Sequence, residues 1–133
     1  HLFTAMRYPA DYGFVPDTLA EDGDPLDVLV ILDEPTFPGV HVKARPIGVF
    51  WMRDEAGPDA KVLCVPHGDE RYEQIQDLDD IRPYLLSEIR HFFEVYKALE
   101  PHKHTAVREW DGVAAAWAEI EASRRRFAEA HPH

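Results

Sequence analysis

The sequence predicts one α+β domain that is mainly β, with a small barrel or strongly curled sheet followed by two helices. Two observations carry this prediction. The first two thirds of the 133 residues hold short runs rich in Val and Ile, separated by Pro and Gly. The last third places apolar residues three and four positions apart, the spacing of one helix face. A chain of this length can bury a core without disulfides.

Four runs have the length and composition of β-strands. They cover residues 27–32, 40–44, 47–52 and 61–65. The turn-forming residues around them are Pro35, Pro38, Gly39, Pro46, Gly57 and Pro58. Short strands at this spacing are typical of a small barrel.

Two helices are expected in the last third of the chain. The first opens near Pro83 and ends before Pro101, because proline lacks the N–H that a helix interior needs. The second is expected over about residues 113–128, and the run Arg124-Arg125-Arg126 lies near its end. Basic side chains complement the negative end of the helix dipole, so we interpret this run as a solvated helix end rather than an anion site.

Composition narrows the classes of function. A net charge of −11 disfavours nucleic acid as a partner, because binding the phosphate backbone needs clustered Lys and Arg. No apolar run reaches about 18 residues, so no membrane span is expected. The single cysteine, Cys64, cannot form an intramolecular disulfide. Its apolar surroundings predict a buried thiol, which fits a reducing, cytoplasmic location.

Residues 21–27, Glu-Asp-Gly-Asp-Pro-Leu-Asp, form the most informative segment. Asp22, Asp24 and Asp27 lie close together beside a Gly and a Pro, which favour a tight turn. Like charges at this spacing repel, so a folded loop that holds them favours a bound cation, and oxygen ligands suit Mg²⁺ or Mn²⁺ better than zinc. From these residues alone, a solvated acidic turn remains the alternative. An EF-hand does not fit, because its sixth position needs Gly and falls on Asp27.

A second acidic segment, residues 54–61, places Asp54, Asp59 and Lys61 around a Gly-Pro turn. Carboxylates hold metals and an ammonium neutralises phosphate oxygens, so this mixture fits a metal–phosphate site. An ordinary hairpin is the alternative. Further side chains suited to such a site are Tyr8, Tyr12, Tyr96 and Lys97. Taken singly, each tyrosine is better explained by packing with its hydroxyl hydrogen-bonded.

Four motifs in this order resemble the family I soluble inorganic pyrophosphatases of the bacterial type. The pattern Tyr-Pro-x-x-Tyr-Gly stands at residues 8–13, and the family signature Asp-x-Asp-Pro-aliphatic-Asp stands at residues 22–27. The pattern Asp-Glu-Ala-Gly-x-Asp-x-Lys follows at residues 54–61, and His-Phe-Phe-x-x-Tyr-Lys at residues 91–97. The resemblance runs from residue 1 to about residue 110. Four collinear motifs make coincidence implausible.

The resemblance implies a role for each matching residue. The implied metal ligands are Asp22, Asp27, Asp54 and Asp59, with Asp27 bridging two metals. Asp24 is implied as the group that accepts a proton from the attacking water. The implied phosphate-binding residues are Lys61, Lys97, Tyr12 and Tyr96, and Tyr8 lines the same site.

The resemblance also implies a fold and a reaction. The fold is a five-stranded closed barrel of the oligonucleotide-binding type with two main C-terminal helices packed outside, and bacterial members form homohexamers. The reaction is Mg²⁺-dependent hydrolysis of pyrophosphate to two orthophosphates by a metal-activated water, with Mn²⁺ or Zn²⁺ as substitutes and Ca²⁺ as an inhibitor. Two metals that share a carboxylate can lower the pKa of a water from about 15.7 towards 7. The alternative from another class is a non-catalytic barrel that binds divalent metal or nucleotide.

In the family, a segment before this start supplies two glutamates, a lysine and an arginine to the site. We therefore expect one pyrophosphatase domain over residues 1–133 that lacks an N-terminal segment, and a natural protein that extends upstream of His1. A chain that begins at His1 is expected to be badly impaired, because several charge contacts to the phosphates are lost.

Overall fold

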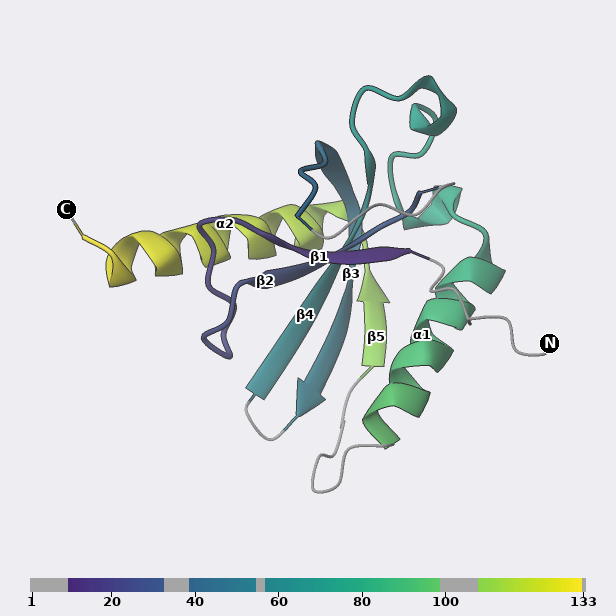
Figure 1. Ribbon diagram of the computed structural model, residues 1–133. Coiled ribbons are helices and arrows are strands. Elements are labelled where there is room, and N and C mark those ends of the chain that lie inside the picture. Colours follow the sequence, from purple (N-terminus) through teal and green to yellow (C-terminus); the bar gives the residue numbers. More distant parts are fainter. Residues whose placement is uncertain (1–9, 33–38, 55–56, 99–107, 133) are drawn as a thin grey trace.

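The computed structural model describes residues 10–32, 39–54, 57–98 and 108–132, with only the backbone described at residues 53, 54, 57, 95–98 and 108. The strands are β1 (Asp11–Val15), β2 (Leu26–Val30), β3 (Ala44–Asp54), β4 (Gly57–Pro66) and β5 (Arg108–Asp111). The helices are α1 (Pro83–Ala98) and α2 (Val113–Ala130), and two short 3₁₀ turns precede α1, η1 (Glu70–Tyr72) and η2 (Leu78–Asp80). Figure 1 shows the two helices on either side of the sheet.

The five strands form one mixed sheet in the order β1-β2-β4-β3-β5. β2 and β4 run parallel, and the other three neighbouring pairs are antiparallel. The expected mainly β fold with five strands and two helices is therefore confirmed. The expected closed barrel is not confirmed, because within the described residues β1 and β5 are the two edges of an open sheet and no ladder joins them.

Strand β3 contains the expected strand at residues 47–52 and extends it at both ends, whereas only Ala44 of the expected strand at residues 40–44 belongs to it. It runs without a break through Pro46, where the register shifts between Pro46 and Gly48 as a β-bulge. A bulge accommodates proline because the residue opposite needs no ladder bond from the missing N–H. Residues 40–43 belong to no strand, and Val40 and Val42 are exposed. β1 and β5 were not predicted from the sequence.

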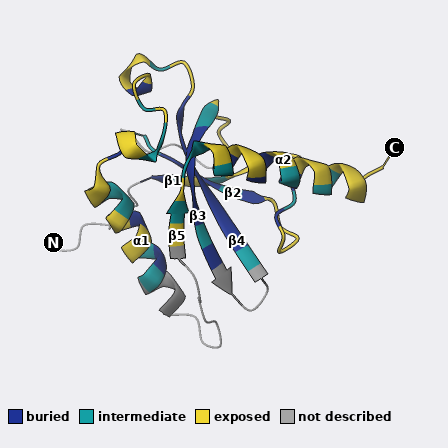
Figure 2. Cartoon of the chain, turned by 180° about the vertical axis from the view of Figure 1, so that it is seen from behind, coloured by how far each residue is buried: buried dark blue, intermediate teal, exposed yellow. Residues whose placement is uncertain are grey.

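The two faces of the sheet bury two separate apolar clusters. On one face, Leu29 and Leu63 pack with Phe93 of α1. On the other face, Val28 and Val62 pack with Ile120 of α2. Successive residues of one strand therefore point alternately towards α1 and α2, as the two-residue period of a strand requires. Figure 2 shows this burial concentrated along the strands and on the inner sides of both helices.

Both helices lie close to their expected positions. Pro83 is the first residue of α1, where its missing N–H removes no helical bond. α2 begins after Gly112 with no cap from its own N-cap side chain, and Asp77 Oδ1 instead accepts a hydrogen bond from the Val113 N–H at 3.1 Å. A side chain at Gly112 would approach that Asp77 oxygen to 2.9 Å, so glycine leaves room for this cap. Among the described residues, no helix is long and apolar enough to cross a membrane.

Candidate active site: a lysine between two carboxylates

Lys61 lies at the centre of the candidate site. Its side chain is only 7% exposed. Its Nζ donates hydrogen bonds to Asp27 Oδ2 at 2.7 Å, to Asp59 Oδ1 at 3.1 Å and to the Tyr12 hydroxyl at 3.0 Å. An ammonium group has three N–H donors, so these three bonds use all of them.

The register of the sheet brings these side chains together. Asp27 of β2 stands opposite Lys61 of β4 in the parallel ladder. Asp59 precedes Lys61 by two residues in β4 and therefore lies on the same face. Tyr12 of β1 pairs with Leu29, two residues beyond Asp27, so it too shares that face. A slip of one residue in any of these strands would turn its side chain to the opposite face.

Aromatic rings flank the ammonium of Lys61. Its Nζ lies 5.5 Å from the centroid of the Tyr12 ring and 5.7 Å from that of Phe93. Phe93 belongs to α1 and stacks on Phe50 of β3 with centroids 5.9 Å apart. Sequence reasoning placed Phe93 only on the apolar face of a helix. The signal that could have assigned it to the site is its position inside the motif at residues 91–97.

The surroundings of Lys61 and Tyr12 fix their protonation. Burial alone would lower the pKa of Lys61, but the nearby Asp59 and Asp27 carboxylates outweigh it and raise the pKa above its ordinary value. Burial raises the pKa of Tyr12 to about 12, although Lys61 opposes this shift. Tyr12 is 51% exposed, yet its hydroxyl end contacts the buried ammonium. At neutral pH the site therefore holds a cationic lysine and a neutral phenol.

We expect the raised pKa of Tyr12 to make the fold less stable at alkaline pH. Between about pH 10 and pH 12 the unfolded chain loses the phenolic proton while the folded chain keeps it, which favours unfolding as pH rises. Denaturant melts of the protein and of Tyr12→Phe should run parallel from pH 7 to 9, and the variant should lose stability less steeply above pH 10. Identical slopes above pH 10 would contradict this.

The acidic loop before β2 is a tight turn held by its own backbone. The Asp24 N–H donates to Asp22 Oδ1 at 2.9 Å, and the Asp24 carbonyl accepts from the Ala20 N–H at 2.8 Å. Gly23 has a φ of +88°, a conformation that residues with a side chain rarely adopt. Asp22 and Asp24 are exposed at the surface of this loop.

The structure brings some predicted site residues together and leaves others apart. Asp27, Asp59, Lys61 and Tyr12 meet, whereas Asp22 and Asp24 stand on the neighbouring loop. Within the described residues no three His, Cys, Asp or Glu side chains are grouped to hold one metal ion. Four predicted site residues cannot be placed. Tyr8 lies outside the described residues, and only the backbone is described for Asp54 in β3 and for Tyr96 and Lys97 in α1.

The donors at the site nevertheless suit a hard divalent cation. Asp27 and Asp59 offer carboxylate oxygens only, which fit Mg²⁺ better than zinc. These two carboxylates already share one cation, the ammonium of Lys61. The residues present therefore fit the chemistry of a magnesium site.

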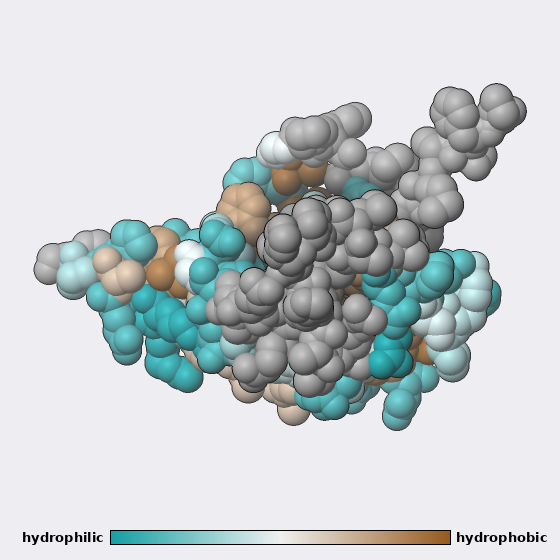
Figure 3. Space-filling view, turned by 90° about the horizontal axis from the view of Figure 1, so that it is seen from below, coloured by the Kyte–Doolittle hydropathy of each residue, from teal (hydrophilic) through white to brown (hydrophobic). Residues whose placement is uncertain are grey.

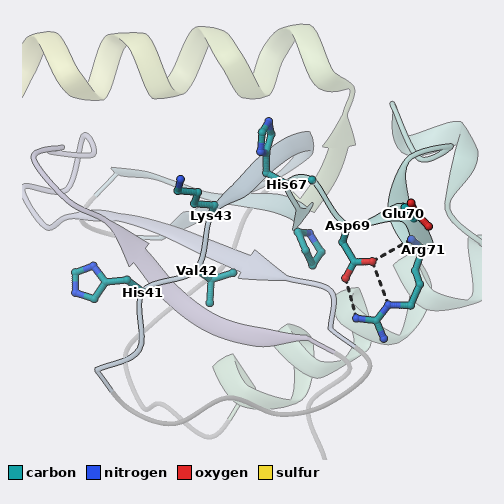
Figure 4. A pocket seen from close by; sticks show the side chains of 9 residues that line it. His41, Val42, Lys43, His67, Asp69, Glu70 and Arg71 are labelled. Carbon is teal, nitrogen blue, oxygen red and sulfur yellow. Dashed lines mark hydrogen bonds and ion pairs between the residues drawn. The ribbon is translucent and has the colours of Figure 1, made fainter.

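A separate hollow of about 750 Å³ lies on another part of the molecule. It is lined by residues before β3 and after β4, among them His41, Lys43 and His67 (Figure 4). At one side of it, Asp69 and Arg71, two residues apart on the same segment, form an ion pair of 2.7 Å, which neutralises both groups. None of Tyr12, Asp27, Asp59 or Lys61 lines this hollow, so it is distinct from the candidate site.

Comparisons of the sequence and of the structure with known proteins all find the same family. A family model described as inorganic pyrophosphatase matches residues 1–128. An inorganic pyrophosphatase from Streptomyces coelicolor is 55% identical over 132 residues, which are 99% of this chain and 81% of that protein. Another from Leifsonia xyli is 56% identical over 115 residues, which are 86% of this chain and 71% of that protein. The solved structure of an inorganic pyrophosphatase from Coxiella burnetii matches 93% of this chain and 75% of its own, with a TM-score of 0.85 and 55% identity.

Proposed function

The chain belongs to the inorganic pyrophosphatase family, and we propose how its residues divide the work of that family's reaction. It is an enzyme that hydrolyses pyrophosphate to two orthophosphates with Mg²⁺. The observation that supports the proposed roles most directly is the buried ammonium of Lys61 between Asp27 and Asp59. That arrangement supplies carboxylates for cations and a fixed positive charge for phosphate in one place.

The proposed magnesium ligands are Asp22, Asp27, Asp54 and Asp59. Asp27 is the ligand proposed to be shared between two ions, and its position opposite Lys61 supports a central place in the site. When bound, the divalent ions neutralise the charge of pyrophosphate and make a water more acidic. The carboxylates supply the negative charge that concentrates these ions, so an acidic chain is compatible with an anionic substrate.

Lys61 is proposed to bind a phosphate oxygen. Because its three N–H groups are already committed to Tyr12, Asp27 and Asp59, this contact requires that one of those bonds be exchanged for the substrate. The Phe93 ring shields the ammonium on one side, which reduces competition from water. Positive charge held in place in this way stabilises the charge that moves between oxygens during phosphoryl transfer. The other proposed phosphate-binding residues are Tyr12, Tyr96 and Lys97, with Tyr8 lining the site.

Asp24 is proposed to take the proton from the attacking water. Its backbone is held from both sides, by Asp22 Oδ1 and by the Ala20 N–H. Its carboxylate is exposed, and a carboxylate held on a fixed backbone is a suitable general base.

Phosphate release from pyrophosphate tests the proposed function. Mg²⁺ should support turnover, Mn²⁺ or Zn²⁺ should substitute in part, and Ca²⁺ should bind and inhibit. Ca²⁺ is larger and accepts more ligands with looser geometry, so it should misplace the attacking water. Metal binding without turnover would instead indicate a non-catalytic metal-binding module. Equal turnover with Ca²⁺ and Mg²⁺ would overturn the proposed site.

Assembly and location are further parts of the proposal. We propose a homohexamer in the cytoplasm, on the basis of the family resemblance. Sedimentation or light scattering of the purified protein, which gives its mass in solution, tests the assembly. A mass of one, two or three chains would contradict it.

A further inference from the structure

Helix α2 is bonded to the segment that leads into the acidic loop. The Leu19 N–H donates to the Ser123 carbonyl at 3.0 Å, and Arg126 Nη1 donates to the Leu19 carbonyl at 3.1 Å. Both backbone polar groups of Leu19 are therefore held by α2. Arg126 also reaches the loop itself, with its Nη2 4.0 Å from Glu21 Oε1. Figure 1 shows the β1–β2 connection running beside α2.

Arg126 is itself fixed by a buried polar network on α2. Its Nη1 donates to Glu119 Oε2 at 3.2 Å and lies 3.3 Å from Ser123 Oγ. The Ser123 hydroxyl donates to the same Glu119 oxygen at 3.2 Å. Ser123 is fully buried and Glu119 is 8% exposed. A partly buried ion pair of this kind adds little net stability, but it holds its groups in one geometry.

The two ends of the loop are joined at Thr18, which is buried. Its Oγ1 donates to the Val15 carbonyl at the end of β1 and accepts from the Leu26 N–H at the start of β2, at 3.0 Å. Thr18 therefore ties the loop to the sheet, and Arg126 ties the neighbouring Leu19 to α2. Between these anchors and β2 lie Asp22 and Asp24.

The run Arg124-Arg125-Arg126 is thus only partly the solvated helix end expected from the sequence. Arg124 and Arg125 are exposed, and Arg124 pairs with Glu121 at 3.5 Å on the helix surface. Arg126 turns inward, with 31% of its side chain exposed. Figure 3 shows a mainly hydrophilic surface on the projecting end of α2, as expected for its exposed positions.

We propose that Arg126 is a positioning residue for the reaction, because it fixes the acidic loop so that Asp22 and Asp24 are placed relative to Asp27. This inference rests on the proposed roles of those aspartates. Arg126 acts through the backbone of Leu19 and touches neither metal nor substrate. Without Arg126, the loop samples more positions. Mg²⁺ binding must then order the loop, and this loss of conformational entropy weakens the binding.

The test compares Arg126→Ala with Arg125→Ala, a matched loss of one arginine from an exposed neighbouring position. Hydrogen exchange of the amides in residues 18–25, measured without metal, should be faster in Arg126→Ala and unchanged in Arg125→Ala. The Mg²⁺ concentration for half-maximal phosphate release should rise about tenfold in Arg126→Ala. Its kcat at saturating Mg²⁺ should fall much less. Arg126→Lys should lie between, because a single ammonium cannot reproduce the bonds of the planar guanidinium fork.

If Arg126→Ala matches Arg125→Ala in both exchange and Mg²⁺ dependence, the positioning role is overturned. If Arg126→Ala does not fold, the same comparison with Arg126→Lys decides the question. The variant Asp22→Asn distinguishes an error in the positioning role of Arg126 from an error in the proposed function. An unchanged Mg²⁺ dependence in Asp22→Asn would overturn the metal assignment, whereas a shift in Asp22→Asn without one in Arg126→Ala would overturn the positioning role alone.

Discussion

Replacing Lys61 by methionine should lower turnover by about a hundred- to thousand-fold, the usual effect of losing one preorganised charge contact in a site that stabilises developing charge. It should also destabilise the fold by about 3 kcal/mol, because it leaves two carboxylates facing each other without their cation. Asp59 is 10% exposed and Asp27 is 27% exposed, which places this cost at the lower end for broken buried pairs. Excess Mg²⁺ should restore part of the stability by replacing the ammonium between the two carboxylates.

Phosphate release at saturating Mg²⁺ and denaturant melts with and without Mg²⁺ measure these effects. Lys43→Met is the matched control, because Lys43 is exposed and lies away from the site. It should leave both turnover and stability close to those of the parent protein. Full turnover in Lys61→Met, or a loss of stability that Mg²⁺ does not touch, would show that Lys61 does not hold this place in the site.

The chemistry of this site was accessible from the sequence because short motifs carry it. Residues 22–27 and 54–61 each place carboxylates beside turn-forming residues, and that local pattern named Asp27, Asp59 and Lys61. That these three side chains contact one another could not be predicted from the local pattern. It depends on the parallel pairing of β2 with β4, which joins segments 34 residues apart and is set by the whole sheet.

The two missed strands lacked a strong local pattern. β1 is the five-residue run DYGFV, which contains a glycine and is only half buried on an edge of the sheet. β5 is the four-residue run REWD, in which three residues are charged. Both form because β2 and β3 offer free backbone groups beside them, which is tertiary context that propensity does not contain. Residues 40–43 illustrate the reverse, since their alternating valines look like a strand but remain exposed.

The role of Arg126 was hidden for a similar reason. A run of three arginines near a helix end is typical of a solvated surface. What distinguishes Arg126 from Arg125 is the carbonyl of Leu19, which is 107 positions away in the sequence. The spacing of four and three residues predicts that Glu119, Ser123 and Arg126 share one face of α2. It does not predict which segment of the chain this face binds.

Asp27→Asn and Asp24→Asn should separate two roles within one loop. Asp27→Asn should lower turnover by about a hundred- to thousand-fold and raise the Mg²⁺ concentration needed for half-maximal rate, because a shared ligand loses its charge and Lys61 loses a partner at 2.7 Å. Asp24→Asn should lower kcat by about a hundred- to ten-thousand-fold with little change in Mg²⁺ dependence, because it removes a general base.

The pH profile distinguishes the two variants further. With Asp24 replaced, hydroxide must take the place of the lost base, so the kcat profile of Asp24→Asn should move towards alkaline pH. The kcat profile of Asp27→Asn, measured at saturating Mg²⁺, should keep its position, because the base is intact. Mg²⁺ titrations at several pH values measure both properties in one experiment. Asp17→Asn is a control for loss of a carboxylate from an exposed part of the same β1–β2 connection, and it should match the parent protein. Indistinguishable Mg²⁺ dependence and pH profiles in Asp27→Asn and Asp24→Asn would remove the distinction between ligand and base, and the loop would then act only as a collective source of negative charge.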